Sequence, residues 1–215
     1  MTLAEPDVAL TDWVLALECG VFAYLIRRGS RPGQPSRGWL LLFFGAGSLA
    51  ALAGGTVHGF FPDGGSAGAR ILWPATLGLI GLSGLAAWGI GASLQLQRRA
   101  ARRLVAAAAL ALVAYAGALA YLTQAFVLAI AYYLPAALFL LVVFLLAWRR
   151  TQARELLVAA LGLVTTFLAA AIQLAGVGLH PRYFNHNALY HLVQALGLFM
   201  IFRGARWLVR AGRTE

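Results

Sequence analysis

The longest uncharged stretch of the sequence runs from Leu104 to Trp148, which is 45 residues without Asp, Glu, Lys or Arg. A soluble domain has charges on about a quarter of its residues, so such a stretch cannot form a water-facing surface. As one helix it would be about 67 Å long, twice the thickness of the hydrocarbon core of a membrane. We therefore expect it to cross a membrane twice and to fold back at the polar pair Thr123–Gln124.

The composition of the whole chain is that of an integral membrane protein. Hydrophobic residues make up 61% of the 215 residues and charged residues only 11%. Because one span takes about 20 apolar residues, the chain 1–215 predicts a single all-α domain, a bundle of seven transmembrane helices. We place Pro74 in the first turn of the third span. The expected spans are 8–26, 38–60, 71–94, 104–123, 125–148, 156–178 and 183–202.

The arginines predict how the bundle is oriented. The chain has 17 arginines and no lysine, and fifteen of the arginines fall at span ends on one side, opposite Arg70 and Arg182. By the positive-inside rule, the N-terminus lies outside and the C-terminus inside. The acidic start of the chain, with Glu5 and Asp7, is unlike a cleavable signal peptide. We expect a protein of the bacterial inner (cytoplasmic) membrane that contacts membrane lipid.

Other classes of protein are excluded or gain no support. A retinal protein needs a lysine for its Schiff base, which this sequence lacks. The single cysteine, Cys19, excludes an intramolecular disulfide and a cysteine-built metal cluster. The orientation of the protein in the membrane accounts for its basic charge. That charge therefore gives no reason to expect binding of nucleic acid. Nothing in the sequence indicates a soluble protein partner.

Ionisable residues gather in the expected outer half of the bundle. An ionisable side chain inside a span is costly and is by default a functional hypothesis. Glu18 is ten residues into the first span, near the midplane, where it is either a neutral, hydrogen-bonded residue or a functional one. Asp12 lies closer to the surface and either caps the helix or joins an interior polar cluster. The outer residues are Glu5, Asp7, Asp12, Glu18, Asp63, His58, His180, His186 and His191.

The seventh span is the richest in polar side chains. Asn187, His191 and Gln194 are spaced i, i+4, i+7 and so share one helix face, whereas His186 points about 140° away from His191. We expect His58 and His191 to meet at one depth. His186 joins them if the first turn of the helix is distorted. Three histidines with a carboxylate would suit Zn²⁺ with one open position for water.

This layout resembles the seven-helix membrane hydrolase superfamily of alkaline ceramidases and progestin/adiponectin receptors. The resemblance implies a zinc site in which His58 is the ligand from the second span and His191 one of two from the seventh, with Asp63 as the nearby Asp. The sequence has HxxxxH in place of the family's HxxxH, and Gly54 in place of its serine. The segment from Phe184 to His191 looks more like an uncharacterised bacterial seven-helix family.

Three functions are open at this point. The first is a zinc-dependent hydrolase of a lipid amide or ester near the outer leaflet, in which His58, His186 and His191 hold the metal. Asp63 or Asp12 would then be the general base or would orient a ligand. The second is a non-catalytic lipid-binding or accessory protein with a metal-free histidine network. The third is haem ligation by two facing histidines.

Overall fold

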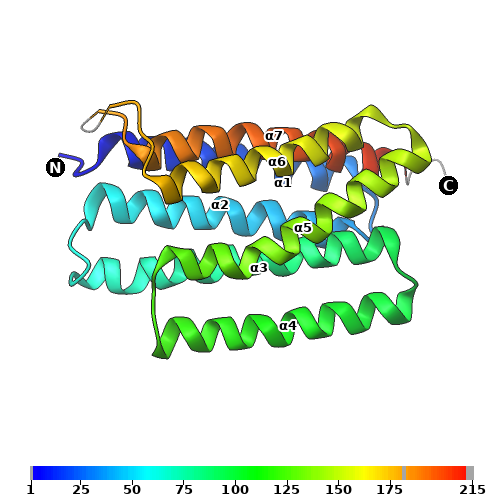
Figure 1. Cartoon of the computed structure of the whole chain (residues 1–215), viewed down its shortest axis with the longest axis horizontal. Helices are drawn as coiled ribbons and strands as arrows, with labels where there is room; N and C mark the ends of the chain where they lie inside the picture. The colour runs from blue at the N-terminus through cyan, green and yellow to red at the C-terminus, as the bar shows by residue number, and fades with distance from the viewer. Residues whose placement is uncertain (1, 181–182, 212–215) are drawn as a thin grey trace.

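The computed structural model describes residues 2–180 and 183–211 of the chain, which form seven helices and, apart from an isolated bridge between His180 and Phe184, no β-structure (Figure 1). All seven of these helices are long and apolar enough to cross a membrane. The predicted all-α bundle is therefore confirmed. The helices are α1 (Pro6–Gly29), α2 (Arg37–Phe60), α3 (Ala67–Gln95), α4 (Arg98–Tyr121), α5 (Phe126–Thr151), α6 (Arg154–Ala175) and α7 (His186–Ala211).

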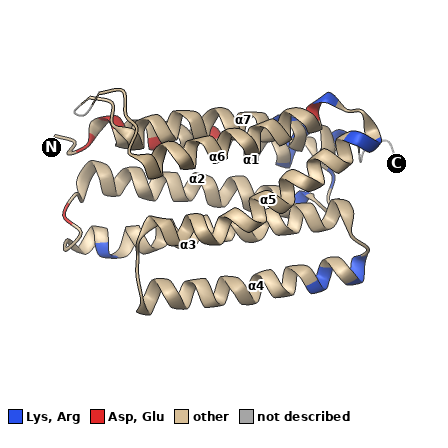
Figure 2. Cartoon of the chain, viewed as in Figure 1, with Lys and Arg blue, Asp and Glu red and all other residues tan. Residues whose placement is uncertain are grey.

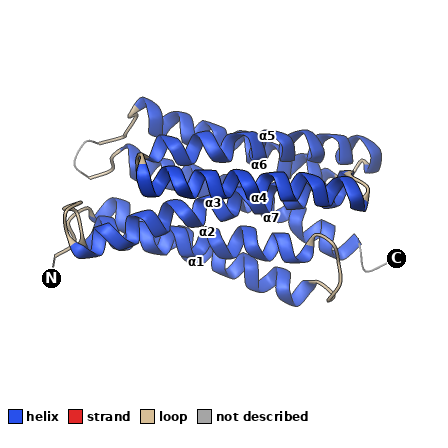
Figure 3. Cartoon of the chain, turned by 90° about the horizontal axis from the view of Figure 1, so that it is seen from below, coloured by secondary structure: helices blue, strands red, loops and turns tan. Residues whose placement is uncertain are grey.

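The helices other than α4 form a closed ring in the order α1, α2, α3, α5, α6, α7, because α7 returns to pack against α1. In Figure 1, α5 runs obliquely from α3 towards α6, and Figure 3 shows the same bundle turned by 90°. α4 lies outside the ring and packs mainly on α3. Leu110 on its outer face is 73% exposed, as expected for a helix surrounded by lipid. Tyr115 anchors α4 by donating a hydrogen bond to the Leu77 carbonyl at 2.9 Å.

Charge divides the bundle into two ends (Figure 2). The arginine end carries the basic residues at one end of α1, α4, α5, α6 and α7, such as Arg27, Arg98, Arg149, Arg154 and Arg210. The polar end holds the N-terminus and the residues Glu5, Asp7, Asp12, His58 and His191. Arg70 at the start of α3 is a basic residue of the polar end, whereas Arg182 and Arg213 lie outside the described residues.

Three helix starts differ from the sequence-based expectation by three residues or more. α4 begins at Arg98 and not at 104. α3 begins at Ala67, so Pro74 lies inside the helix and not in its first turn. The hydroxyl of Ser66 caps this earlier start by accepting a hydrogen bond from Ala69 N at 3.2 Å. α7 begins at His186 instead of 183. Asn185 caps it, because its side-chain oxygen accepts from Asn187 N at 2.8 Å and from Ala188 N at 3.2 Å.

The half of the bundle towards the arginine end is densely packed. Phe22 stacks on Phe202 at 4.1 Å between ring centroids, and both rings lie against Phe44, which is fully buried. α6 and α7 approach most closely at glycines. A Cβ atom on Gly162 would lie 2.6 Å from the carbonyl oxygen of Gly197. Small residues let helices pack this closely in membranes. Close van der Waals packing between helices therefore holds this half together.

Candidate functional site

A cavity of about 270 Å³ lies inside the ring. Residues from α1, α2, α3, α5, α6 and α7 line it, so closing the ring creates it. Most of its surface is apolar, with Phe43, Phe44 and Leu198 at its deeper side. The polar groups that line it include Asp12, His58, Gln173, Asn187, His191 and Gln194. A largely apolar hollow with a few polar side chains is typical of a small-molecule site.

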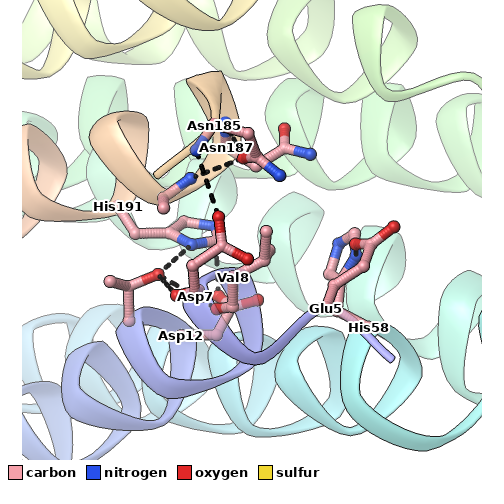
Figure 4. A network of polar contacts seen from close by, with 10 residues as sticks. Glu5, Asp7, Val8, Asp12, His58, Asn185, Asn187 and His191 are labelled. Atoms are coloured by element: carbon pink, nitrogen blue, oxygen red, sulfur yellow. Dashed lines mark hydrogen bonds and ion pairs between the residues drawn. The ribbon is translucent and has the colours of Figure 1, made fainter. Parts of the chain in front are cut away.

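The imidazole of His191 is held by two adjacent residues of α1 (Figure 4). Its Nε2 lies 3.2 Å from Oδ1 of Asp12, and its Nδ1 lies 3.1 Å from the hydroxyl oxygen of Thr11. The side chains of His191 and Asp12 are 9% and 7% exposed. Both ring nitrogens are engaged, so the orientation of the ring is fixed. A buried histidine–carboxylate pair of this kind is able to accept or donate a proton.

A notch in α2 lets Asp12 lie this deep. A Cβ atom on Gly55 would lie 2.8 Å from Cβ of Asp12 and 2.8 Å from the Trp13 ring. At Gly54 it would lie 3.3 Å from Oδ2 of Asp12. The two glycines thus let the neighbouring helix α1 approach α2 closely.

His58 makes a separate pair at the surface. Its Nδ1 lies 2.6 Å from Oε2 of Glu5, and the carboxylate side chain is 42% exposed. The backbone reinforces this contact, because Glu5 N donates to the His58 carbonyl at 3.3 Å. A second hollow of about 600 Å³ opens at the polar end beside Glu5 and Arg70, and it shares His58 and Trp73 with the cavity. The rings of His58 and Trp73 therefore stand between this second hollow and the cavity.

Five rings follow one another around the polar side of the cavity, and we call them the aromatic arc: His58, Trp73, Phe126, Tyr190 and His191. Successive ring centroids lie 6.3, 6.4, 6.0 and 5.0 Å apart. All five residues line the cavity. The arc joins four helices and presents ring surface to whatever occupies the cavity.

Two fully buried side-chain oxygen atoms have no hydrogen-bond partner among the described residues. They are Oε1 of Gln173, which belongs to a residue lining the cavity, and Oε2 of Glu18, which does not. A buried acceptor left unpaired costs about 1–3 kcal/mol. A ligand with an N–H or O–H group would satisfy the Gln173 oxygen. At Glu18 the structure gives Oε2 no partner on a neighbouring helix.

The structure brings together part of the predicted site. Asp12, His58, His191, Asn187 and Gln194 all line the cavity. His186 is the first residue of α7 and is not among the lining residues. Asp63 is exposed in the α2–α3 loop, where its carboxylate accepts from Gly65 N at 2.9 Å. His180 lies in the α6–α7 loop and is not among the lining residues.

The predicted set of zinc ligands does not assemble in this arrangement. Within the described residues, no group of three or more His, Cys, Asp or Glu side chains is placed to hold a metal ion. The nitrogens of His191 face Asp12 and Thr11, and Nδ1 of His58 faces Glu5. We therefore assign no chemical step to a metal.

Two residues of the site were missed by the sequence reasoning. Thr11 gave no signal in the sequence, because a threonine next to Asp12 is an ordinary helix residue. In the structure its hydroxyl also donates a hydrogen bond to the Asp7 carbonyl at 2.8 Å. Gln173 offered a clear signal, because it is the one amide side chain inside the expected sixth span. Polar residues inside a span are costly unless they serve a partner or a ligand.

Comparison with known proteins identifies the family to which the sequence is similar. The model of a family of unknown function (DUF6962) matches residues 8–209. No curated protein and no solved structure matches the chain. The matched range includes the residues of the aromatic arc and the Asp12–His191 pair.

Proposed function

The chain belongs to the family of unknown function DUF6962, so we propose its function from the cavity itself: it is a membrane-embedded binding protein for a small, largely apolar molecule with one polar group. The observation that carries this proposal is a largely apolar cavity, enclosed by six helices, whose lining includes the buried Asp12–His191 pair. The polar group of the ligand would lie towards that pair. Its apolar part would lie against Phe43, Phe44 and Leu198.

Filling the cavity tests this proposal. Ala50 lines the cavity, so Ala50→Leu should displace the ligand. Ala107→Leu is the matched control, because Ala107 is exposed on α4 and does not line the cavity. Protein purified in mild detergent is extracted with organic solvent, and the extract is analysed by mass spectrometry. We expect near one-to-one ligand in the wild type and in Ala107→Leu, and a large loss in Ala50→Leu. Equal amounts in all three proteins would contradict the proposal.

A zinc-dependent hydrolase of a lipid amide or ester is the second candidate. It is favoured by one observation, which is that His58, His191 and Asp12 line the same cavity. Metal binding would require His58 and His191 to exchange their present partners for the ion. Metal analysis of the purified protein tests it: one zinc per chain that is lost in His58→Ala and His191→Ala but kept in His180→Ala would support it. Iron with a Soret band would point to haem instead.

We infer that the polar end faces outwards and the arginine end faces the cytoplasm of a bacterial inner membrane. The inference rests on the arginines, because basic loops stay on the cytoplasmic side. Asp63→Cys should react with an impermeant thiol reagent from outside, and Arg99→Cys only from inside, in a Cys19→Ala background. Reaction of both from one side would overturn the orientation.

A further inference from the structure

The charges and rings around the cavity point to the class of its ligand. We propose that the cavity binds a compact lipophilic amine in its ammonium form, held between the carboxylate of Asp12 and the aromatic arc. This inference rests on the proposed function, since it names the ligand of the same cavity. Three observations carry it: the charge of the lining, the arrangement of the rings, and the polar groups and volume of the cavity.

The lining carries acid but no fixed positive charge. None of the described residues that line the cavity is Lys or Arg, and Asp12 is its acidic member. A carboxyl group buried inside the membrane ionises only beside a positive charge, so Asp12 is either neutral or paired with a cation. A buried charge without a counter-ion is strongly unfavourable. An ammonium ligand supplies the missing positive charge, whereas a carboxylate or phosphate ligand would be repelled.

The aromatic arc offers a cation a favourable surface. The faces of aromatic rings attract ammonium groups, and Trp is the best of them. Trp73, Phe126 and Tyr190 stand in successive ring contact between the two histidines, and all three line the cavity with Asp12. Several aromatic rings and an acidic side chain that line one cavity are the components with which proteins bind ammonium groups.

The polar groups and the volume of the cavity complete the site. Oδ1 of Asp12 lies beside Nε2 of His191, and its Oδ2 lies beside Gly54, which also lines the cavity. Gln173 is a further polar residue of the same lining. The volume of about 270 Å³ has room for roughly nine groups of water size, at about 30 Å³ each. The ligand is therefore a small amine and not a lipid with two chains.

A pair of isosteric probes tests the charge directly. Phenyltrimethylammonium and tert-butylbenzene have nearly the same shape, but a carbon replaces the charged nitrogen in the second. Each is titrated calorimetrically into purified full-length protein in maltoside detergent. We expect the wild type to bind the ammonium probe at least tenfold more tightly than the neutral one. Asp12→Asn should abolish that preference, and Trp73→Leu should weaken the binding of the ammonium probe several-fold.

Glu18→Gln is the matched control, because it removes a carboxylate of the same helix that does not line the cavity. It should keep the preference for the ammonium probe. Equal affinity of the two probes in the wild type would overturn the inference, because it would mean that a protonated His191 already compensates the charge of Asp12. The proposed function would still stand, since the cavity would bind both probes. If neither probe binds and the extracts contain no ligand, the proposed function itself fails. The wild-type comparison stands even if Asp12→Asn does not fold.

Discussion

The two ends of the bundle are built on different principles. Towards the arginine end, Phe22, Phe44 and Phe202 fill the space between α1, α2 and α7, and Gly162 brings α6 against α7. Towards the polar end, the same helices are joined by directed contacts, such as the pair between His191 and Asp12, around a hollow. The comparison teaches that one half supplies rigidity by packing. The other half can then afford a cavity without losing the arrangement of its helices.

The largest effect should come from opening a hole in the packed half. Phe44→Ala removes a fully buried ring that contacts three others. In water-soluble cores such a change costs about 3–5 kcal/mol. We expect roughly 2–3 kcal/mol here, since lipid takes the place of water around the bundle. Denaturant unfolding in detergent measures it. Phe60→Ala, at a residue that is 45% exposed, is the control and should cost clearly less.

Overfilling the α6–α7 contact should cost somewhat less. The added methyl of Gly162→Ala would meet the backbone of Gly197 and cannot be relieved by a side-chain movement. We expect a loss of about 1–2 kcal/mol. Gly117→Ala is the matched control, because nothing lies within 4 Å of a Cβ atom there. It should be neutral or raise stability by up to about 1 kcal/mol, through helix propensity. Equal melting temperatures for the two variants would show that the close approach is unimportant.

The polar end should respond more weakly, and unequally at its two histidines. His191→Ala leaves the buried carboxylate of Asp12 without its donor, which we expect to cost about 1–2 kcal/mol. His58→Ala should cost less than about 1 kcal/mol, because its partner Glu5 is partly in water. Thermal unfolding of both variants at one pH makes the comparison. A larger loss for His58→Ala would mean that the surface pair is the main tie at this end.

The smallest change in the free energy of unfolding is expected at the border between the two halves. Unlike the others, it should be an increase in stability. Oε2 of Glu18 is buried without a partner among the described residues. Glu18→Leu removes that unsatisfied atom and should raise stability by up to about 1 kcal/mol. Glu18→Gln should lie between Glu18→Leu and the wild type in the same unfolding assay. A loss of stability in Glu18→Leu would reveal a partner on a neighbouring helix.

The sequence alone predicted the helices well because their length and apolar character are local properties. The shared face of Asn187, His191 and Gln194 was predictable for the same reason, since it follows from helical periodicity. The clamp on His191 by Thr11 and Asp12 was not, because one sequence does not say which helices are neighbours. His186 stays apart from the cavity since Asn185 caps α7 cleanly. The first turn is therefore not distorted, which joining the other histidines would have required.

The contact between Thr11 and His191 joins residues 180 positions apart in the chain. At roughly 5–20 residues per second, a ribosome needs about 10–40 s to synthesise that interval. The wall formed by α7 is the last to be made, so during translation α1 waits in the membrane with Asp12 uncovered. Biogenesis therefore has a vulnerable interval that ends only when the last helix arrives. A chain stopped before residue 186 would expose its acidic half-site to lipid and to membrane quality control.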